Sequence, residues 1–229
     1  MGFKERGFEI PIYIEEFKEP ERVIIISCEG SNTEPEYFET IKEKLSEYIP
    51  VILEIKIVPK EPGASEPKDI VCNLEKYILD QYDYKSDYDE MWVVWDREKV
   101  QARKDNILKI LPECRKKNYH IAITNPLFEF WLLLHIVDIT EYDNNVLYIN
   151  DWMSLSKKKR FIEKELLTKL YPIGGYNKKK GQFNKNIVTK KNILQALKQE
   201  KFFANKFEDI LDNLGSNIGE LINKILKIK

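Results

Sequence analysis

Short apolar runs recur along the first 137 residues, separated by segments with a different periodicity. Three runs are rich in β-branched or aromatic residues, as strands buried on both faces are: 23–26, 91–95 and 120–124. A fourth segment, 51–58, alternates apolar and charged residues and is followed by Pro59. These four segments are the predicted strands.

The stretches between the predicted strands have helical spacing. Apolar residues recur three or four positions apart after Thr33, within 68–81 and within 100–117. Thr33 is predicted to cap the first helix, and Asn125 to cap a fourth with Pro126 at its first position. Strands and helices that alternate in this way predict an α/β fold, a Rossmann-like parallel sheet flanked by helices on both faces.

The pattern changes after residue 137. Helical spacing predicts helices at about 155–170, 187–203 and 205–227, with a glycine- and lysine-rich loop at 173–181. We therefore expect an N-terminal arm at 1–20, an α/β domain at 21–137 and a helical C-terminal subdomain at 138–229, packed on the sheet.

Composition and charge add a further division. Hydrophobic residues make up 43% of the 229 residues and charged residues 33%, the profile of a globular protein in water. Residues 1–150 contain 19 Lys and Arg against 30 Asp and Glu, whereas 151–229 contain 18 against 8. The basic half could bind phosphates and the acidic half cations, or the two halves could simply attract each other.

No sequence feature indicates a membrane or an oxidising compartment. The longest apolar run, 130–137, is too short to span a bilayer, and the start lacks the apolar stretch of a secretory signal. The three cysteines have neither metal-binding nor disulfide-framework spacing. A cytoplasmic location is the expectation.

Acidic residues follow the predicted strands where ligand sites of parallel sheets form. Glu29 follows the first strand, Asp96 and Glu98 the third, and Asn125 the fourth. Carboxylates that converge there would repel each other unless a cation neutralised them, and oxygen-only ligands favour Mg²⁺ or Mn²⁺. A single such residue could equally be a turn former or a helix cap. The acidic segment 87–90 is expected at the opposite edge, as solvated surface.

Three blocks of sequence resemble the RloB-like family. They are 26–38 (ISCEGSNTEPEYF), 94–98 (VWDRE) and 125–135 (NPLFEFWLLLH), in the order found in that family. The resemblance implies a Toprim domain, the catalytic fold of type IA and II topoisomerases, DnaG-type primases and OLD-family nucleases. It also implies a bacterial anti-phage defence role, often beside an ATPase partner.

The same resemblance assigns roles to particular residues. In Toprim enzymes the first Glu, here Glu29, is a metal ligand or general acid or base, and the pair matching Asp96 and Glu98 holds Mg²⁺. Glu98 departs from the usual Asp, and Arg97 beside it could pair with one of the carboxylates. OLD-like nucleases have a second-metal acid near the position of Glu34. That residue could instead serve only as a favourable charge at a helix N-terminus.

Two buried-helix residues and one loop complete the candidates. Glu129 is an acid on an apolar helix and needs a cation, N–H donors or a basic partner, so it is a second-metal ligand or half of an ion pair. His135 is expected to be a packing residue. Lys178, Lys179 and Lys180 lie among aromatic residues in a loop, which suits contact with a nucleic-acid backbone, although a solvated loop has the same composition.

The leading hypothesis is a Mg²⁺- or Mn²⁺-dependent nuclease that hydrolyses DNA or RNA through Glu29, Asp96 and Glu98, with a second ion near Glu34 and Glu129. The alternative is a non-catalytic or partner-dependent subunit of an ATPase-containing defence complex. The sequence leaves open whether the chain forms a homodimer.

Overall fold

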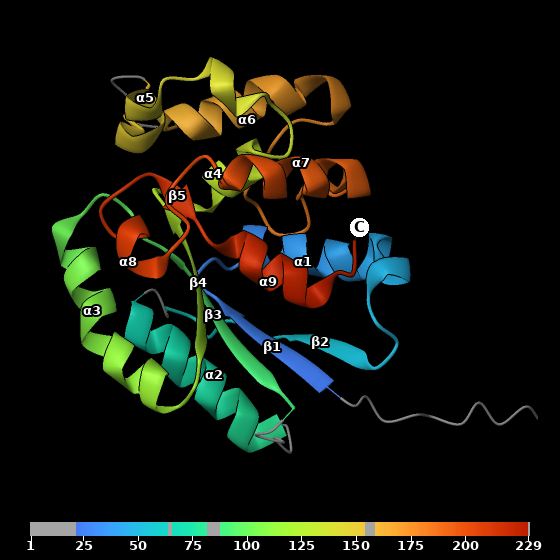
Figure 1. The fold of residues 1–229 in the computed structure, drawn as a ribbon, viewed down its shortest axis with the longest axis vertical. Coiled ribbons are helices and arrows are strands. Elements are labelled where there is room, and N and C mark those ends of the chain that lie inside the picture. The colour runs from blue at the N-terminus through green and yellow to red at the C-terminus, as the bar shows by residue number, and fades with distance from the viewer. Residues whose placement is uncertain (1–21, 64–65, 82–87, 154–158, 229) are drawn as a thin grey trace, which may run out of the picture.

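A computed structural model describes residues 22–63, 66–81, 88–153 and 159–228 (Figure 1). The predicted N-terminal arm lies outside these ranges. The protein is an α/β fold built on one five-stranded sheet with the order β2-β1-β3-β4-β5. The strands are β1 (Arg22–Cys28), β2 (Leu53–Ile57), β3 (Glu90–Asp96), β4 (His120–Asn125) and β5 (Gly215–Ser216). The first four are parallel, as predicted, and β5 runs antiparallel to β4.

Successive residues of the central strands pack into separate cores on the two faces of the sheet. Ile24 and Ile26 belong to one hydrophobic cluster and Ile25 to the other, and all three are fully buried. Because neighbouring side chains of a strand point to opposite faces, an unbroken apolar run requires cover on both faces. This arrangement confirms the interpretation of the apolar runs.

The helices divide between the two faces (Figure 1). One face is covered by α2 (Pro67–Gln81), α3 (Gln101–Lys116) and α8 (Phe207–Ile210). The larger core includes α1 (Thr33–Lys44), α4 (Phe128–Leu133), α6 (Phe161–Leu170), α7 (Lys190–Glu200) and α9 (Ile218–Ile225). The helix α5 (Asn144–Ile149) and four short 3₁₀ segments complete the described elements: Ser46–Tyr48, Ile139–Glu141, Tyr171–Ile173 and Lys185–Ile187.

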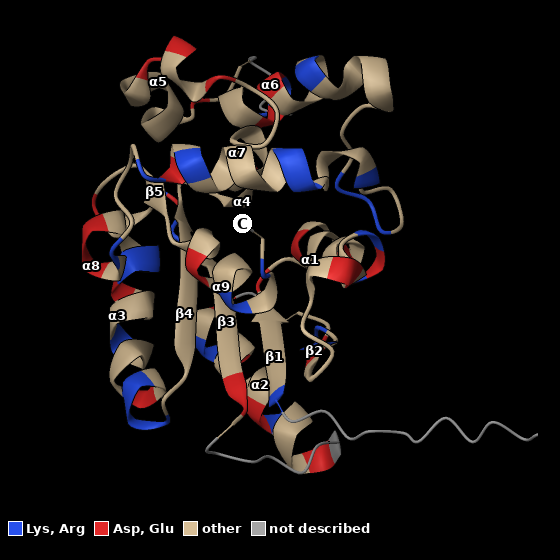
Figure 2. Ribbon diagram, turned by 45° about the vertical axis from the view of Figure 1, so that its right-hand side comes forward, with Lys and Arg blue, Asp and Glu red and all other residues tan. Residues whose placement is uncertain are grey.

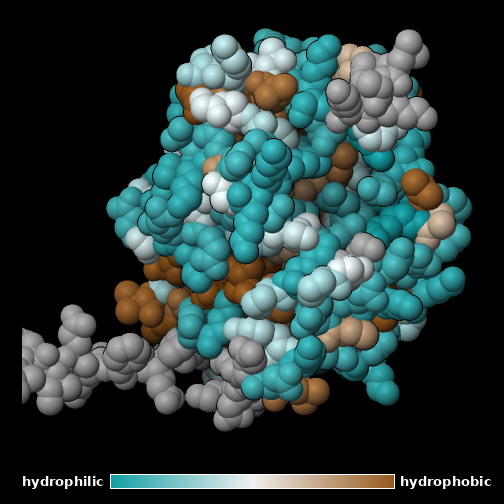
Figure 3. All heavy atoms as spheres, turned by 180° about the vertical axis from the view of Figure 1, so that it is seen from behind, coloured by the Kyte–Doolittle hydropathy of each residue, from teal (hydrophilic) through white to brown (hydrophobic). Residues whose placement is uncertain are grey.

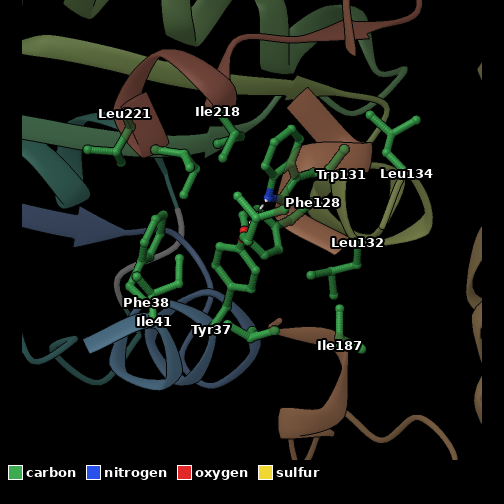
Figure 4. Close-up of a cluster of buried hydrophobic side chains, with 14 of the residues drawn as sticks. Tyr37, Phe38, Ile41, Phe128, Trp131, Leu132, Leu134, Ile187, Ile218 and Leu221 are labelled. Atoms are coloured by element: carbon green, nitrogen blue, oxygen red, sulfur yellow. Dashed lines mark hydrogen bonds between the residues drawn. The ribbon is translucent and has the colours of Figure 1, made fainter. Parts of the chain in front are cut away.

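Residues of the C-terminal half share the larger core with the sheet. Ile218 and Leu221 of α9 lie near Phe38 and Trp131 in the close-up of this core (Figure 4). Trp131 Nε1 donates a hydrogen bond of 2.9 Å to Tyr37 Oη inside it. The helices after residue 137 are therefore part of one continuous core with the α/β half.

The region around 125–128 differs from the prediction. Asn125 is the last residue of β4, the Asn125–Pro126 peptide is cis, and α4 begins at Phe128 with Leu127 before it. Asn125 does not cap this helix because its side-chain amide instead donates 2.8 Å to the carbonyl of Ile210. The predicted cap and the proline at the first helical position were both wrong.

The predicted helix 205–227 is also interrupted. It is divided into α8, β5 and α9. Asn217 explains the break, because its side chain accepts from the Ile123 amide at 2.7 Å and donates to the Ile121 carbonyl at 2.9 Å. These two bonds hold this segment against β4. The start predicted for the helix 155–170 falls partly outside the described residues, and α6 begins at Phe161.

The acidic segment before β3 is not solvated surface. Asp89 is 7% exposed and accepts a 2.9 Å hydrogen bond from the Val23 amide. Glu90 forms ion pairs with Arg22 and Lys224. Position 87 lies outside the described residues. The carboxylates therefore secure the amino-terminal edge of the sheet.

The surface has the polarity expected from the composition. The face drawn in Figure 3 is mainly hydrophilic. Cys28 and Cys114 are buried as free thiols, and Cys72 is exposed. Within the described ranges, none of the helices combines the length and the apolar character needed to cross a bilayer.

Candidate acidic pocket at the sheet edge

A pocket of about 290 Å³ lies beyond the carboxyl ends of β1 and β3. Four carboxylates and two lysines line it, together with the turn that leads into α1: Glu29, Gly30, Ser31, Asn32, Thr33, Glu34, Lys60, Asp96, Glu129 and Lys178. Figure 2 shows the distribution of acidic and basic residues over the same elements. The pocket brings together four of the five acidic residues singled out from the sequence.

Glu29 is fixed by a hydrogen bond and an ion pair. Its Oε2 accepts 3.0 Å from the Asp96 amide and pairs with Arg103 of α3. Its own amide donates 3.0 Å to the Val94 carbonyl, so the residue continues the ladder of the sheet. Burial raises the pKa of Glu29, and the Arg103 guanidinium opposes that shift. The carboxylate is thus held at the junction of β1 and β3.

Asp96 joins the end of β3 to the start of α4. Its Oδ1 accepts a 2.8 Å hydrogen bond from the Phe128 amide, the first residue of the helix. Burial raises the pKa of Asp96 well above its usual value, and the charges of Glu34, Glu29 and Glu129 raise it further. The negative charges of these three neighbours therefore disfavour a charge on Asp96.

Glu34 is the second residue of α1 and is 6% exposed. Its Oε1 accepts 3.1 Å from the Gly30 amide. Burial raises the pKa of Glu34 to about 7, followed in size by repulsion from Glu129. A Cβ atom at position 30 would overlap the Glu34 carboxylate, so glycine permits this close approach. The carboxyl group can therefore gain or lose a proton near neutral pH.

Glu129 lies in the first turn of α4 and is 3% exposed. Its Oε1 accepts 2.5 Å from the Tyr176 hydroxyl and pairs with Lys178 Nζ at 2.5 Å. Lys178 Nζ also pairs with Glu163 of α6 at 2.6 Å. Burial acts to lower the pKa of Lys178, but attraction to Glu129 and Glu163 outweighs it and the pKa rises. Of the two readings of Glu129, the structure shows the ion pair.

Glu98 lies apart from the other acids. It does not line the pocket, although its charge contributes to raising the pKa of Glu29. The strand has ended at this point: Glu98 has φ 42°, and its amide donates 2.9 Å to the Pro126 carbonyl. Glu98 therefore lies in a left-handed turn of the backbone after β3.

Arg97 does not pair with a pocket carboxylate. Its guanidinium donates to the carbonyls of Leu211, Glu98 and Val100. The basic residues that do contact the pocket were not predicted for that role. Lys60 Nζ donates to the Glu29 carbonyl, and Arg103 pairs with the Glu29 carboxylate. The helix α3 carries several exposed basic residues, so nothing in the sequence distinguishes Arg103 as the one that contacts Glu29.

The remaining candidates lie outside the pocket. Lys179 and Lys180 are exposed, next to Lys178. His135 is fully buried and lies 3.1 Å from Tyr37 Oη and 2.9 Å from the Trp131 carbonyl. Burial lowers the pKa of His135 to about 4, so it is neutral at physiological pH. It is a packing histidine, as predicted.

The pocket has the ligand atoms that a divalent cation prefers, but its carboxylates are not spaced as in a metal site. Four carboxylates supply the hard oxygen ligands that Mg²⁺ and Mn²⁺ prefer. In the part of the chain that the structure describes, no group of three or more Asp, Glu, His or Cys side chains has the arrangement of a metal site. Lys178 and Arg103 contact two of the four carboxylates instead.

The chain matches the model of a known protein family. The model of the family described as RloB-like protein matches residues 24–225. The chain belongs to the RloB-like family. The match includes every pocket residue as well as the C-terminal helices, and it confirms the resemblance of the three motif blocks. Neither the curated proteins nor the solved structures yield a significant match to this RloB-like chain.

Proposed function

We propose that this RloB-like protein is a Toprim-type nuclease that hydrolyses phosphodiester bonds of DNA or RNA with the aid of Mg²⁺. One observation carries the proposal. Carboxylates from the end of β1, the first turn of α1, the end of β3 and the first turn of α4 line a single pocket, and they raise one another's pKa values. Buried carboxylates that repel one another in this way are typical of a functional site, and a cation would relieve their repulsion.

Within the proposed site, Glu29, Asp96 and Glu129 would hold the ion, and the charge of Glu98 acts on Glu29 from outside the pocket lining. When bound, Mg²⁺ supplies polarisation of the scissile phosphate and lowers the pKa of a bound water. The Arg103 ion pair orients the Glu29 carboxylate, and the Phe128 amide orients that of Asp96. Glu34 lines the same pocket and would be the residue placed to accept a proton from the attacking water.

Lysines around the pocket would hold the nucleic-acid backbone. Lys60 lines the pocket, and the exposed Lys179 and Lys180 follow Lys178. Contacts of this kind bind phosphates without regard to sequence and weaken as salt rises. We also propose, on the family membership, that the enzyme acts in anti-phage defence inside the bacterial cell, beside an ATPase partner.

The test is cleavage by the full chain of plasmid, single-stranded DNA and tRNA, with Mg²⁺ or Mn²⁺ and with EDTA. Glu29→Gln and Asp96→Asn should each reduce metal-dependent cleavage by roughly 100-fold or more while the protein stays folded. Glu39→Gln, an exposed change on α1, is the matched control and should cleave normally. Cleavage that persists in EDTA, or in both pocket variants, would refute the proposal.

A partner-dependent subunit is the second candidate. It is favoured by the ion pairs of Arg103 and Lys178, which already neutralise two carboxylates in the isolated chain. If the protein binds Mn²⁺ but cuts only after an ATPase partner is added, this candidate is correct. If it cuts alone, the candidate is excluded.

A further inference from the structure

One loop of the C-terminal half crosses the acidic pocket. We call residues 174–183 the strap. It runs between the 3₁₀ segments Tyr171–Ile173 and Lys185–Ile187. Gly174, Gly175 and Gly181 have positive φ angles of 114°, 76° and 72°. Glycine adopts such angles without strain, so the turns at both ends of the strap form without backbone cost.

The strap is fastened to the first turns of α1 by polar contacts. The Glu36 carboxylate accepts from the amides of Gly181 at 2.6 Å and Phe183 at 3.0 Å. Asn32 Nδ2 donates 2.9 Å to the carbonyl of Lys178. All three contacts join segments more than 140 residues apart in sequence. The contacts of Asn32 and Gly181 are exposed, where hydrogen bonds open more readily than in a core, and that of Phe183 is partly buried.

Lys178 carries the strap into the pocket. Its ammonium group contacts two carboxylates, Glu129 with a 4% exposed side chain and Glu163 with a 16% exposed one. The Lys178 side chain itself is 48% exposed, so solvent and ions reach this ion pair. Lys178 is therefore paired with an inner carboxylate that lines the pocket, Glu129, and with an outer one that does not, Glu163.

We propose that the strap is an autoinhibitory element in which Lys178 is an exchangeable internal cation. In the metal-free chain its ammonium neutralises Glu129 and covers the pocket. A divalent cation displaces it from Glu129, and Lys178 stays on Glu163 while the strap loosens. The exchange rests on the proposed function, because it requires the acid cluster to bind a metal.

Charge and geometry favour the exchange. A divalent ion brings two positive charges to carboxylates that repel one another, whereas Lys178 brings one. The ammonium has three donors and keeps one carboxylate after it leaves Glu129, so its charge is never left unpaired. Glu163 is thus the residue that makes release of Lys178 inexpensive.

The experiment measures Mn²⁺ affinity of the full chain by calorimetry for four variants. Lys178→Met keeps the length of the side chain and removes the competing charge, so it should bind Mn²⁺ about tenfold more tightly than the parent. Glu163→Gln removes the outer partner, holds Lys178 on Glu129 and should bind more weakly. Lys169→Met, an exposed lysine of α6, should bind as the parent does. Asp96→Asn should lose Mn²⁺.

Hydrogen exchange of the strap gives an independent readout. Added Mn²⁺ should speed hydrogen exchange of the Gly181 and Phe183 amides in the parent. In Lys178→Met the strap is already loose, so Mn²⁺ should change the exchange rate of these amides little. Unchanged affinity in Lys178→Met, or equal strap protection with and without Mn²⁺, overturns the strap proposal while the metal site stands. If neither the parent nor Lys178→Met binds Mn²⁺, the proposed metal function fails as well.

Discussion

Glu34 shows how a single side chain responds to the pocket around it. Its carboxylate is 6% exposed, receives one backbone hydrogen bond and lies close enough to Glu129 and Glu29 for both charges to act on it. The folded protein therefore holds the Glu34 proton more tightly than the unfolded chain does. Ionisation of this one residue costs folding free energy, and a metal ion or a neutral substitute would relieve that cost.

Glu34→Gln is predicted to stabilise the metal-free protein at high pH. The pKa of Glu34 is about 7 in the folded protein against an ordinary value of 4.5, so stability falls as pH rises from 4.5 to 7 and the full penalty is present above 7. The variant should gain about 1–3 kcal/mol at pH 8 and little at pH 4. Urea unfolding in EDTA at the two pH values measures this difference.

Glu39→Gln provides the comparison for that prediction. It lies on the exposed side of the same helix and pairs with Lys42 at 3.3 Å. A surface pair of this kind contributes little, so its loss should change stability similarly at both pH values. A Glu34→Gln protein less stable than the parent at pH 8 would mean that the charge of Glu34 is compensated in the folded state.

At the scale of elements, the strands and long helices of the first half could be predicted because each has one dominant period. α2 and α3 begin and end within about one residue of the expected limits. The elements that were missed depend on distant contacts. β5 has only two residues, and its position is set by Asn217 against β4. No local pattern reports such a pairing.

In the candidate site, too, the residues that follow a local pattern could be predicted and those that depend on distant contacts could not. Glu29 and Asp96 were found because each directly follows a buried strand, and strand ends share an edge of the sheet. Glu129 was found because an acid on an apolar helix needs a partner. The identity of that partner, Lys178, could not be predicted because it depends on where the strap crosses the pocket. Glu98 does not line the pocket, and its left-handed backbone conformation has no sequence signal in a glutamate, so its role stays a prediction.

Gly215→Ala is predicted to destabilise the fold by about 1–3 kcal/mol. A Cβ atom at this position would overlap the backbone carbonyl of Ala204, which cannot rotate away as a side chain can. The strand β5 would have to separate from β4 or from the Ala204 segment. Urea unfolding followed by far-UV circular dichroism measures the loss.

Gly30→Ala is the informative comparison, because its Cβ atom would meet only the Glu34 side chain. It should disturb Mn²⁺ binding more than stability, whereas Gly215→Ala should do the reverse. Equal stability of Gly215→Ala and the parent would show that the Ala204 segment yields easily.

For the whole molecule, the shared core decides how the protein unfolds. The larger hydrophobic cluster contains residues from Ile24 in β1 to Leu226 after α9. Removal of 138–229 would expose one side of that core, including Phe130 and Trp131, which are now fully buried. The boundary predicted near residue 137 therefore separates two patterns of sequence that fold as one hydrophobic unit.

We predict a single unfolding transition in urea. Tryptophan fluorescence reports mainly the three buried residues of the α/β half, Trp92, Trp95 and Trp131, because the fourth, Trp152, is 46% exposed already in the folded protein. Far-UV circular dichroism reports the helices of both halves. The two curves should coincide. A fragment of residues 21–137 should show no cooperative transition. Separate midpoints for the two signals, or a folded fragment, would contradict the prediction.

The contact between Asn32 and Lys178 joins residues 146 positions apart. On the ribosome, the acids of the pocket are synthesised first, and the lysine that neutralises Glu129 follows it 49 positions later (178 − 129). A nascent chain that stops between these positions therefore has the carboxylates without their cover. Translation order alone places completion of the strap after synthesis of the acids that it covers.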